Sequence, residues 1–239
     1  MAQEQITTLT FFRYTSLLHK IWAFGMMQFA HKDLRTVKGQ KFYKVLGSGK
    51  AGFNPAPDWS VYALLQVWEN EAAAKKFFKD SALIRRYNKH SSEQWTLFLR
   101  NIVARGEWDG QNPFAKHYHL DPVNEHIAVI TRATIRTREL IRFWRSVPAS
   151  QKPLHSNPGL LFTKGIGEVP FVQMATFSIW KDKTSLDEFA YRSDAHVKVI
   201  GKTRTTNWYK EELFSRFQPY RSTGSWHGVN PLPFPEGNH

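Results

Sequence analysis

The chain has 239 residues, of which 41% are hydrophobic and 15% aromatic, so it holds enough apolar material for one large core or two smaller ones. It contains no cysteine, which excludes disulfides, thiolate-bound haem, iron–sulfur clusters and cysteine nucleophiles. Thirty-three Lys and Arg residues against 20 Asp and Glu give a net charge of +13.

The basic residues are scattered along the chain and form no dense cluster or nucleic-acid-binding motif. We therefore expect no specific nucleic-acid partner. Attraction to an anionic membrane and a merely solvated basic surface explain the charge equally well. The N-terminal residues lack a basic segment followed by an apolar one, and no apolar run is long enough to span a membrane. These features predict a cytoplasmic protein that can contact the inner face of the membrane peripherally.

In chain order, β-rich and helical segments alternate, and the second half repeats the first. The first half predicts strand, helix, strand, strand and helix at residues 8–14, 17–27, 42–49, 61–68 and 71–78. The second half predicts the same series at residues 127–133, 138–147, 161–168, 173–180 and 185–191. Each half ends on a similar segment, WDGQNPF at residues 108–114 and WHGVNPL at residues 226–232.

Matching residues are separated by nearly constant distances along the chain, namely 119 for Arg13 and Arg132, 118 for Gly47 and Gly165, and 112 for Trp68 and Trp180. The pattern predicts an α+β protein built from two tandem ferredoxin-like repeats. We expect their antiparallel sheets to face each other and to enclose an apolar space. The polar stretch at residues 116–124 marks the boundary, giving repeats at residues 1–116 and 117–239.

The sequence contains no serine triad, P-loop or dinucleotide-binding fingerprint, and we expect His117 and His119 to be exposed histidines of the linker. His196 lies on one predicted helix face with Val199 and Ile200, and the matching position of the first half is Ile84. From the residues alone, a histidine buried at an interface with satisfied nitrogens is a simpler interpretation than a haem ligand.

Other candidates lie on the strands of the second half. Arg132, Arg136 and Lys164 can pair with haem propionates, although ordinary surface charge explains each of them as well. Glu168 and Gln173 flank a strand end, where a hydrogen-bond donor or proton relay can act on bound oxygen. Glu168 can equally brace the turn that follows it.

Several stretches resemble the spheroidene monooxygenase (acyclic carotenoid 2-ketolase) family, and they cover both halves in the right order. They are LTFFRY, IWAFGMMQFA, FYKVLGSGKAGFNPAPDWSVYALLQVW, ITRATIR, FTKGIGEVP, TFSIWKD, WYKEELFSRF, WDGQNPF and WHGVNPL. The sequence departs from the family at Ala195, where the family often has proline, and around residues 185–192. These departures leave the choice of substrate open.

The resemblance implies a haem b protein that uses dioxygen and an external reductant, such as a ferredoxin, to hydroxylate and then ketonise C-2 of an acyclic carotenoid. It also implies a distant likeness to aldoxime dehydratases and other haem proteins of the dimeric α+β barrel class. In those proteins a histidine on a helix of the C-terminal unit binds the iron, and the matching residue here is His196. Residues 117–239 would then bind haem and residues 1–116 would not. The alternatives are a haem lyase of the aldoxime dehydratase type and a non-catalytic haem- or RNA-binding protein.

Overall fold

The computed structural model describes residues 4–50, 54–145, 157–192 and 208–234. In the first half, the order is β1 (Ile6–Arg13), α1 (Leu17–Leu34), β2 (Gln40–Lys50), β3 (Asn54–Trp68), α2 (Glu71–Asp80), α3 (Ala82–His90) and β4 (Glu93–Gly106). In the second half, it is β5 (Ile127–Ile135), the short 3-10 helix η2 (Thr137–Glu139), β6 (Leu160–Val169), β7 (Gln173–Trp180), α5 (Lys183–Arg192) and β8 (Tyr209–Gly224).

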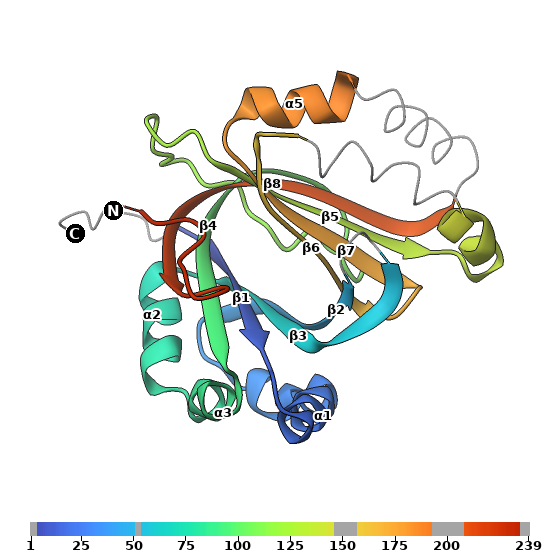
Figure 1. Ribbon diagram of the computed structural model, residues 1–239. Helices are drawn as coiled ribbons and strands as arrows, with labels where there is room; N and C mark the ends of the chain where they lie inside the picture. Colours follow the sequence, from blue (N-terminus) through green and yellow to red (C-terminus); the bar gives the residue numbers. More distant parts are fainter. Residues whose placement is uncertain (1–3, 51–53, 146–156, 193–207, 235–239) are drawn as a thin grey trace.

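The strands form one closed antiparallel barrel in the order β1-β3-β2-β6-β7-β5-β8-β4 (Figure 1). Within each half the spatial order is the same, β4-β1-β3-β2 and β8-β5-β7-β6. The two halves join at two strand edges. At one edge β4 pairs with β8 along most of its length, and at the other β2 pairs with β6 only at Gly47–Gly167 and Ser48–Ile166. The predicted α+β class and antiparallel sheet are confirmed. The strands of the two halves join into a single closed barrel, so no strand edge of the barrel is left unpaired.

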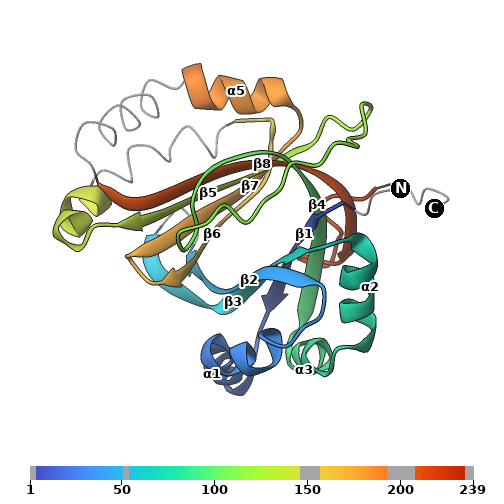
Figure 2. The ribbon, with the colours of Figure 1, turned by 180° about the vertical axis from the view of Figure 1, so that it is seen from behind.

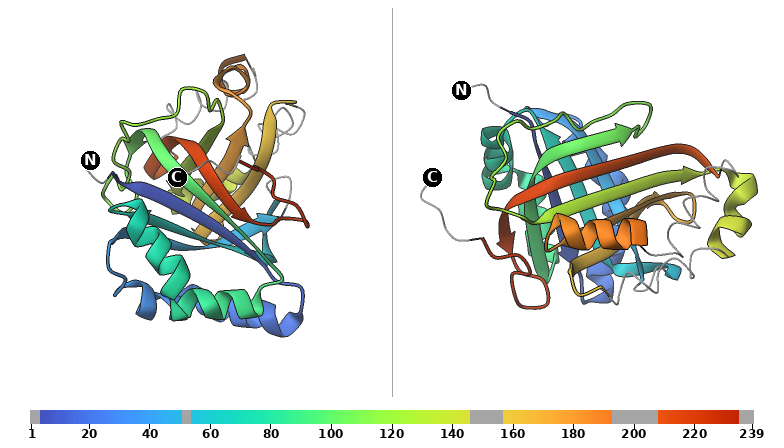
Figure 3. Two further views of the ribbon diagram at one scale, coloured as in Figure 1. Left: turned by 90° about the vertical axis from the view of Figure 1, so that its left-hand side faces the viewer. Right: turned by 90° about the horizontal axis from the view of Figure 1, so that it is seen from above.

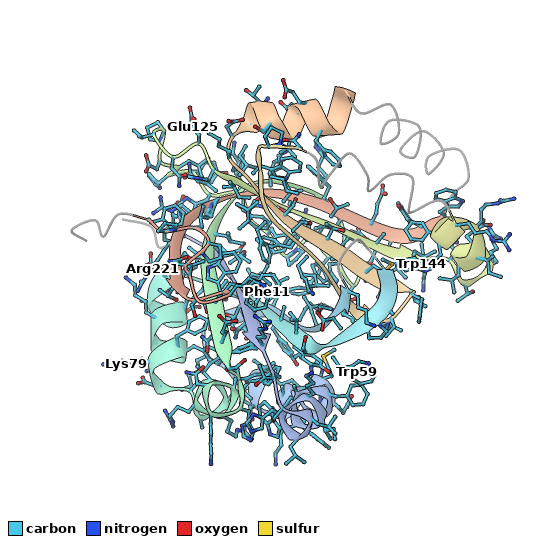
Figure 4. The ribbon with its side chains drawn as sticks, in the orientation of Figure 1. Phe11, Trp59, Lys79, Glu125, Trp144 and Arg221 are labelled. Atoms are coloured by element: carbon cyan, nitrogen blue, oxygen red, sulfur yellow. The ribbon has the colours of Figure 1, made fainter. Side chains whose placement is uncertain are left out.

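A single apolar core fills the barrel, because side chains alternate between its inside and its outside along every strand. Phe11 lies near the centre (Figure 4), with its ring 5.9 Å from Trp95, 5.4 Å from Phe162 and 5.8 Å from Phe177. The buried residues of this core come from both halves of the chain. The space that the sequence predicted between the two sheets is therefore filled by side chains.

Three helices cover the outside of the first half, as Figures 2 and 3 show. Each begins at a side-chain cap, because Ser16, Asn70 and Ser81 accept hydrogen bonds from the backbone N–H groups of the first turns of α1, α2 and α3. Their apolar faces pack on outward-facing residues of the sheet to form a second core. Ile84, the counterpart of His196 in the first half, is buried there.

The outside of the second half is covered more thinly. In the described residues, α5 packs through Leu186 against Ile127, Val129 and Trp180, and this cluster is much smaller than its equivalent in the first half. No helix of the described residues is long and apolar enough to cross a membrane.

Two similar turns close the barrel at opposite ends. Trp108 bridges to Gln111 and Trp226 bridges to Val229, and the next two residues of each turn have positive φ angles. Both indole rings are buried in the barrel core. The echo between WDGQNPF and WHGVNPL thus corresponds to one local structure used twice.

The segment between the halves differs in one respect from the sequence-based expectation. His119 is exposed, as predicted, but His117 is buried with its Nδ1 2.9 Å from Glu4 Oε2, so the exposed position expected for His117 was wrong. Glu4, the acidic partner of His117, lies far from the linker in the sequence. The composition of the linker therefore could not predict the burial of His117.

Candidate functional site

Five charged side chains meet at the barrel end closed by Trp108, where Lys44 and Arg132 are buried and Asp109 is half exposed. Lys44 of β2 is ion-paired to Asp109 and Glu168, and Arg132 of β5 is ion-paired to Glu211 of β8. The Arg132 Nη2 atom also lies 3.8 Å from Asp109 Oδ1 and 3.8 Å from Glu168 Oε1. The structure therefore links the five side chains, which we call the buried charge network.

Trp108 covers the buried charge network and is bonded to it. Its indole Nε1 donates a hydrogen bond to Glu168 Oε1 at 2.7 Å. The Lys44 Nζ atom and the Arg132 guanidinium lie 5.8 Å and 5.5 Å from the indole ring, within range of cation–π attraction. Trp108 thus holds Glu168 in place and shields two cations from water.

Glu211 ties the network to the turn that carries Trp108. Its carboxylate accepts a hydrogen bond from the Gly110 backbone N–H at 2.7 Å. Burial alone would raise the pKa of Glu211, but the hydrogen bond from Gly110 and the Arg132 guanidinium hold this pKa below its ordinary value. Glu211 is therefore a carboxylate at neutral pH.

A cavity of about 820 Å³ opens beside the network, between α1 and β2. Lys44, Asp109 and Glu168 line one side of it, while the apolar side chains of Phe24 and Phe29 line another. The network therefore separates the interior of the barrel from a space large enough for part of an apolar ligand.

Part of the outward face of the second-half sheet carries small side chains, beside the larger Met174 and Phe214, which pair with Ala133 and Thr131. Thr131 is exposed, and Ala133, Thr163, Gly165 and Thr176 are half-buried. Among the described residues, a Cβ atom placed on Gly165 would meet no heavy atom within 4 Å. On the same face of the first half, by contrast, large side chains are buried: Phe12, Tyr14, Val45, Tyr62 and Leu64. In the described part of the second half, the five small residues thus form a section of the sheet surface that large side chains do not fill, and we call this section the seat.

Of the residues singled out from the sequence, the structure brings Arg132 and Glu168 together within the buried charge network. Lys164 also faces inward, and its Nζ donates to Asp58 Oδ2 at 2.8 Å. Gln173 begins β7 and is paired with Thr134 of β5 and Val169 of β6. Arg136 follows β5, where its backbone N–H donates to the Trp208 carbonyl. His196 lies outside the described residues.

Three members of the site, Lys44, Asp109 and Glu211, were not predicted from the sequence. A lysine between Phe42 and Leu46 in the inward alternation of β2 was a usable signal, because a charge at a core position requires a partner. The partners themselves come from distant strands, and no local pattern identifies them.

These features define a closed α+β barrel with a buried charge network at one end and an outer face that the described residues of the second half cover only thinly. By fold it is similar to two solved structures of aldoxime dehydratase, with TM-scores of 0.59 and 0.61 at 10% and 9% identity. The alignments cover 91% of this chain and 82% and 80% of those chains. No known family model matches the chain.

Two curated relatives are much more similar in sequence. The chain is 37% identical to the spheroidene monooxygenase of Cereibacter sphaeroides, over 95% of this chain and 71% of the relative. It is 34% identical to the spheroidene monooxygenase of Rhodobacter capsulatus, over 95% of both chains. The chain belongs to the spheroidene monooxygenase family and is therefore an oxidoreductase, as the resemblance of its motifs predicted.

Proposed function

We propose that the protein is a haem-dependent monooxygenase of acyclic carotenoids such as spheroidene. It hydroxylates C-2 near one end of the polyene and then oxidises the same carbon to a ketone, using dioxygen and an external electron donor such as a ferredoxin. The observation that carries this proposal is the similarity to two spheroidene monooxygenases over nearly the whole chain. The protein acts in the cytoplasm, at the inner face of the membrane.

The architectural part of the proposal is that residues 1–116 and 117–239 are two copies of a ferredoxin-like unit. It is supported by the identical spatial order of the strands in the two halves and by the two matching Trp turns. Only the second copy binds haem, on the outward face of its sheet.

The seat formed by Thr131, Ala133, Thr163, Gly165 and Thr176 can accept a flat prosthetic group, because several of the large side chains on this face of the first half are replaced by small ones. His196 supplies the imidazole that binds the iron. It follows α5 in the sequence, and α5 packs on this same outward face. Bound haem would supply the activation of dioxygen.

Three cations are candidates for the propionates, and they differ in where they lie. Arg136 stands where β5 leaves the sheet and is half-buried. Arg132 and Lys164 face into the barrel, away from the outer surface of the sheet, and are ion-paired to Glu211 and Asp58. Because of this orientation we assign the propionate contact first to Arg136, while Arg132 and Lys164 stabilise the sheet through their ion pairs.

Protons are needed because one oxygen atom of each dioxygen leaves as water. Glu168 is suited to move them, since its carboxylate lines the solvent-accessible cavity and contacts Lys44 and Trp108. Gln173, at the start of the neighbouring strand β7, supplies a neutral amide that can donate a hydrogen bond.

The similarity in fold to aldoxime dehydratase favours one other candidate, a haem lyase that dehydrates an aldoxime and consumes no external electrons in turnover. A non-catalytic haem- or RNA-binding protein is the remaining alternative. Product analysis with a carotenoid and with an aldoxime separates the first two, and the absence of any haem binding would leave only the RNA-binding alternative.

Titration with haem tests the cofactor assignment. The wild-type protein should develop a Soret band that saturates at one haem per chain, and His196→Ala should lose or shift it. His119→Ala is the matched control, because His119 is an exposed histidine of the linker that contacts Glu4. Equal binding by the wild type and His196→Ala would defeat the assignment of His196.

A further inference from the structure

Helix α1 is apolar on both of its faces, which is unusual for a helix on the surface of a protein. One face packs on the barrel through Ala23, Met26, Ala30 and Leu34. The opposite face leaves large apolar side chains in solvent, with Leu18 78% and Phe29 71% exposed. The exposed set, which we call the α1 apolar surface, consists of Leu17, Leu18, Ile21, Phe24, Phe29 and, from β3, Trp59.

The α1 apolar surface is continuous rather than scattered. Residues 17, 21 and 24 follow the helical spacing of three and four, and the Phe24 ring lies 5.0 Å from the ring of Trp59. Trp59 is labelled at the edge of the molecule beside α1 in Figure 4, on the side of the barrel away from α5. A contiguous exposed patch of this kind marks a contact surface.

The charges around this surface are positive. Lys32, Arg35 and Lys38 are exposed at and just beyond the C-terminal end of α1. The only acidic residue of α1, Asp33, is already ion-paired to Arg86 of α3. An apolar helix face flanked by exposed cations is complementary to an anionic lipid surface, where the apolar side chains enter the acyl boundary and the cations meet the headgroups.

We propose that the α1 apolar surface docks the protein onto an anionic lipid bilayer, with α1 lying in the plane of the interface. The proposal rests on the proposed function in one respect, because a long polyene substrate dissolves in lipid. Phe24 and Phe29 belong both to this surface and to the lining of the cavity between α1 and β2. A docked protein therefore turns the mouth of that cavity toward the lipid.

The test is flotation of the full-length, haem-loaded protein with vesicles of mixed phosphatidylglycerol and phosphatidylcholine. The wild type should float with these vesicles, less so at high salt, and less with phosphatidylcholine alone. Leu18→Ser combined with Ile21→Ser should lower the vesicle partition coefficient by at least about tenfold, since two apolar anchors are lost. Val123→Ser combined with Ile141→Ser is the matched control, because both side chains are exposed elsewhere.

Three outcomes would overturn the proposal. They are no flotation of the wild type, equal loss of flotation by the two double variants, and a wild-type dimer that only the α1 variant dissociates, without vesicle binding. Thermal unfolding checks that both variants fold. Both should still oxidise a carotenoid presented in detergent. Loss of flotation with this activity retained separates the docking role from the proposed function, whereas no activity in any protein would count against the function alone.

Discussion

Glu93 and Glu211 perform the same task at opposite ends of the barrel. Glu93 is ion-paired to Arg13 at 3.1 Å and accepts a hydrogen bond from the Gly228 N–H at 2.6 Å. Glu211 is ion-paired to Arg132 and accepts from the Gly110 N–H. Each glutamate thereby connects one of the two Trp-containing turns to a barrel strand, Glu93 the turn at Trp226 and Glu211 the turn at Trp108. The two ends differ in that Arg132 is buried within a network, whereas Arg13 is about one-third exposed.

This difference in burial predicts different costs for removing the two arginines. Arg132→Met should lower the free energy of unfolding by about 3 kcal/mol, because it removes a buried cation from the network and leaves the partly buried Glu211 carboxylate without its ion-pair partner. Arg13→Met, the matched control, should cost about 1 kcal/mol or less, since water screens its ion pair. Urea denaturation measures both. Equal losses would show that the buried charge network does not add to stability in the way described.

A fall in pH should lower the free energy of unfolding, partly because Glu211 becomes protonated. Its pKa in the folded state is lowered, so its contribution to stability is fully present above the ordinary glutamate value of about 4.3 and is lost as the pH falls through the folded-state pKa. Glu211→Gln should therefore flatten the decline of unfolding free energy between about pH 5 and about pH 3. Glu212→Gln, at an exposed neighbouring position, is the control and should leave the decline unchanged. A wild-type slope in the Glu211 variant would refute the role of this carboxylate.

The hydrogen bond from Trp108 to Glu168 can be tested without removing the ring. Trp108→Phe should destabilise the protein by about 1–3 kcal/mol, because Glu168 loses a donor inside the barrel. Trp226→Phe is the control at the other end, where the indole packs against Phe11 and Phe162, and it should cost less. Thermal or urea unfolding provides the comparison, and a larger loss in the control would contradict the prediction.

The seat proposed for haem is open at Gly165. Gly165→Val should leave the stability of the protein unchanged or raise it by about 0.5–1 kcal/mol, since glycine is unfavourable in a strand and the new side chain meets no atom nearby. Haem affinity should nevertheless fall at least about tenfold, which corresponds to about 1.4 kcal/mol, because the side chain enters the seat. Absorbance titration measures the affinity. Undiminished affinity would place the haem elsewhere.

Much of this fold could be predicted from the sequence because its signals are local. Alternating apolar residues predicted β1, β3, β5 and β7, and the similar segments WDGQNPF and WHGVNPL indicated that the second half repeats the first. The separate helix α3 was not predicted in the first half, although Ser81, which caps it, interrupts the helical pattern at the end of α2. Ser81 was therefore a signal in the sequence for the start of a second helix.

Long-range pairing could not be predicted in the same way. The contacts of β2 with β6 and of β4 with β8 join strands more than 100 residues apart, and no local pattern selects those edges. For the same reason, the sequence identified Arg132 and Glu168 as candidates but not their partners Glu211 and Lys44. Their burial follows from closure of the barrel, which is a property of the whole chain.

Turnover under isotopically labelled dioxygen tests the central claim most directly. The haem-loaded protein is incubated with spheroidene and a reducing system, and the carotenoid products are analysed by mass spectrometry. The account predicts label in a product oxygenated at C-2, with no product when dioxygen or the reductant is omitted. Unlabelled or absent carotenoid product, together with conversion of an aldoxime to a nitrile by the same reduced protein, would contradict it.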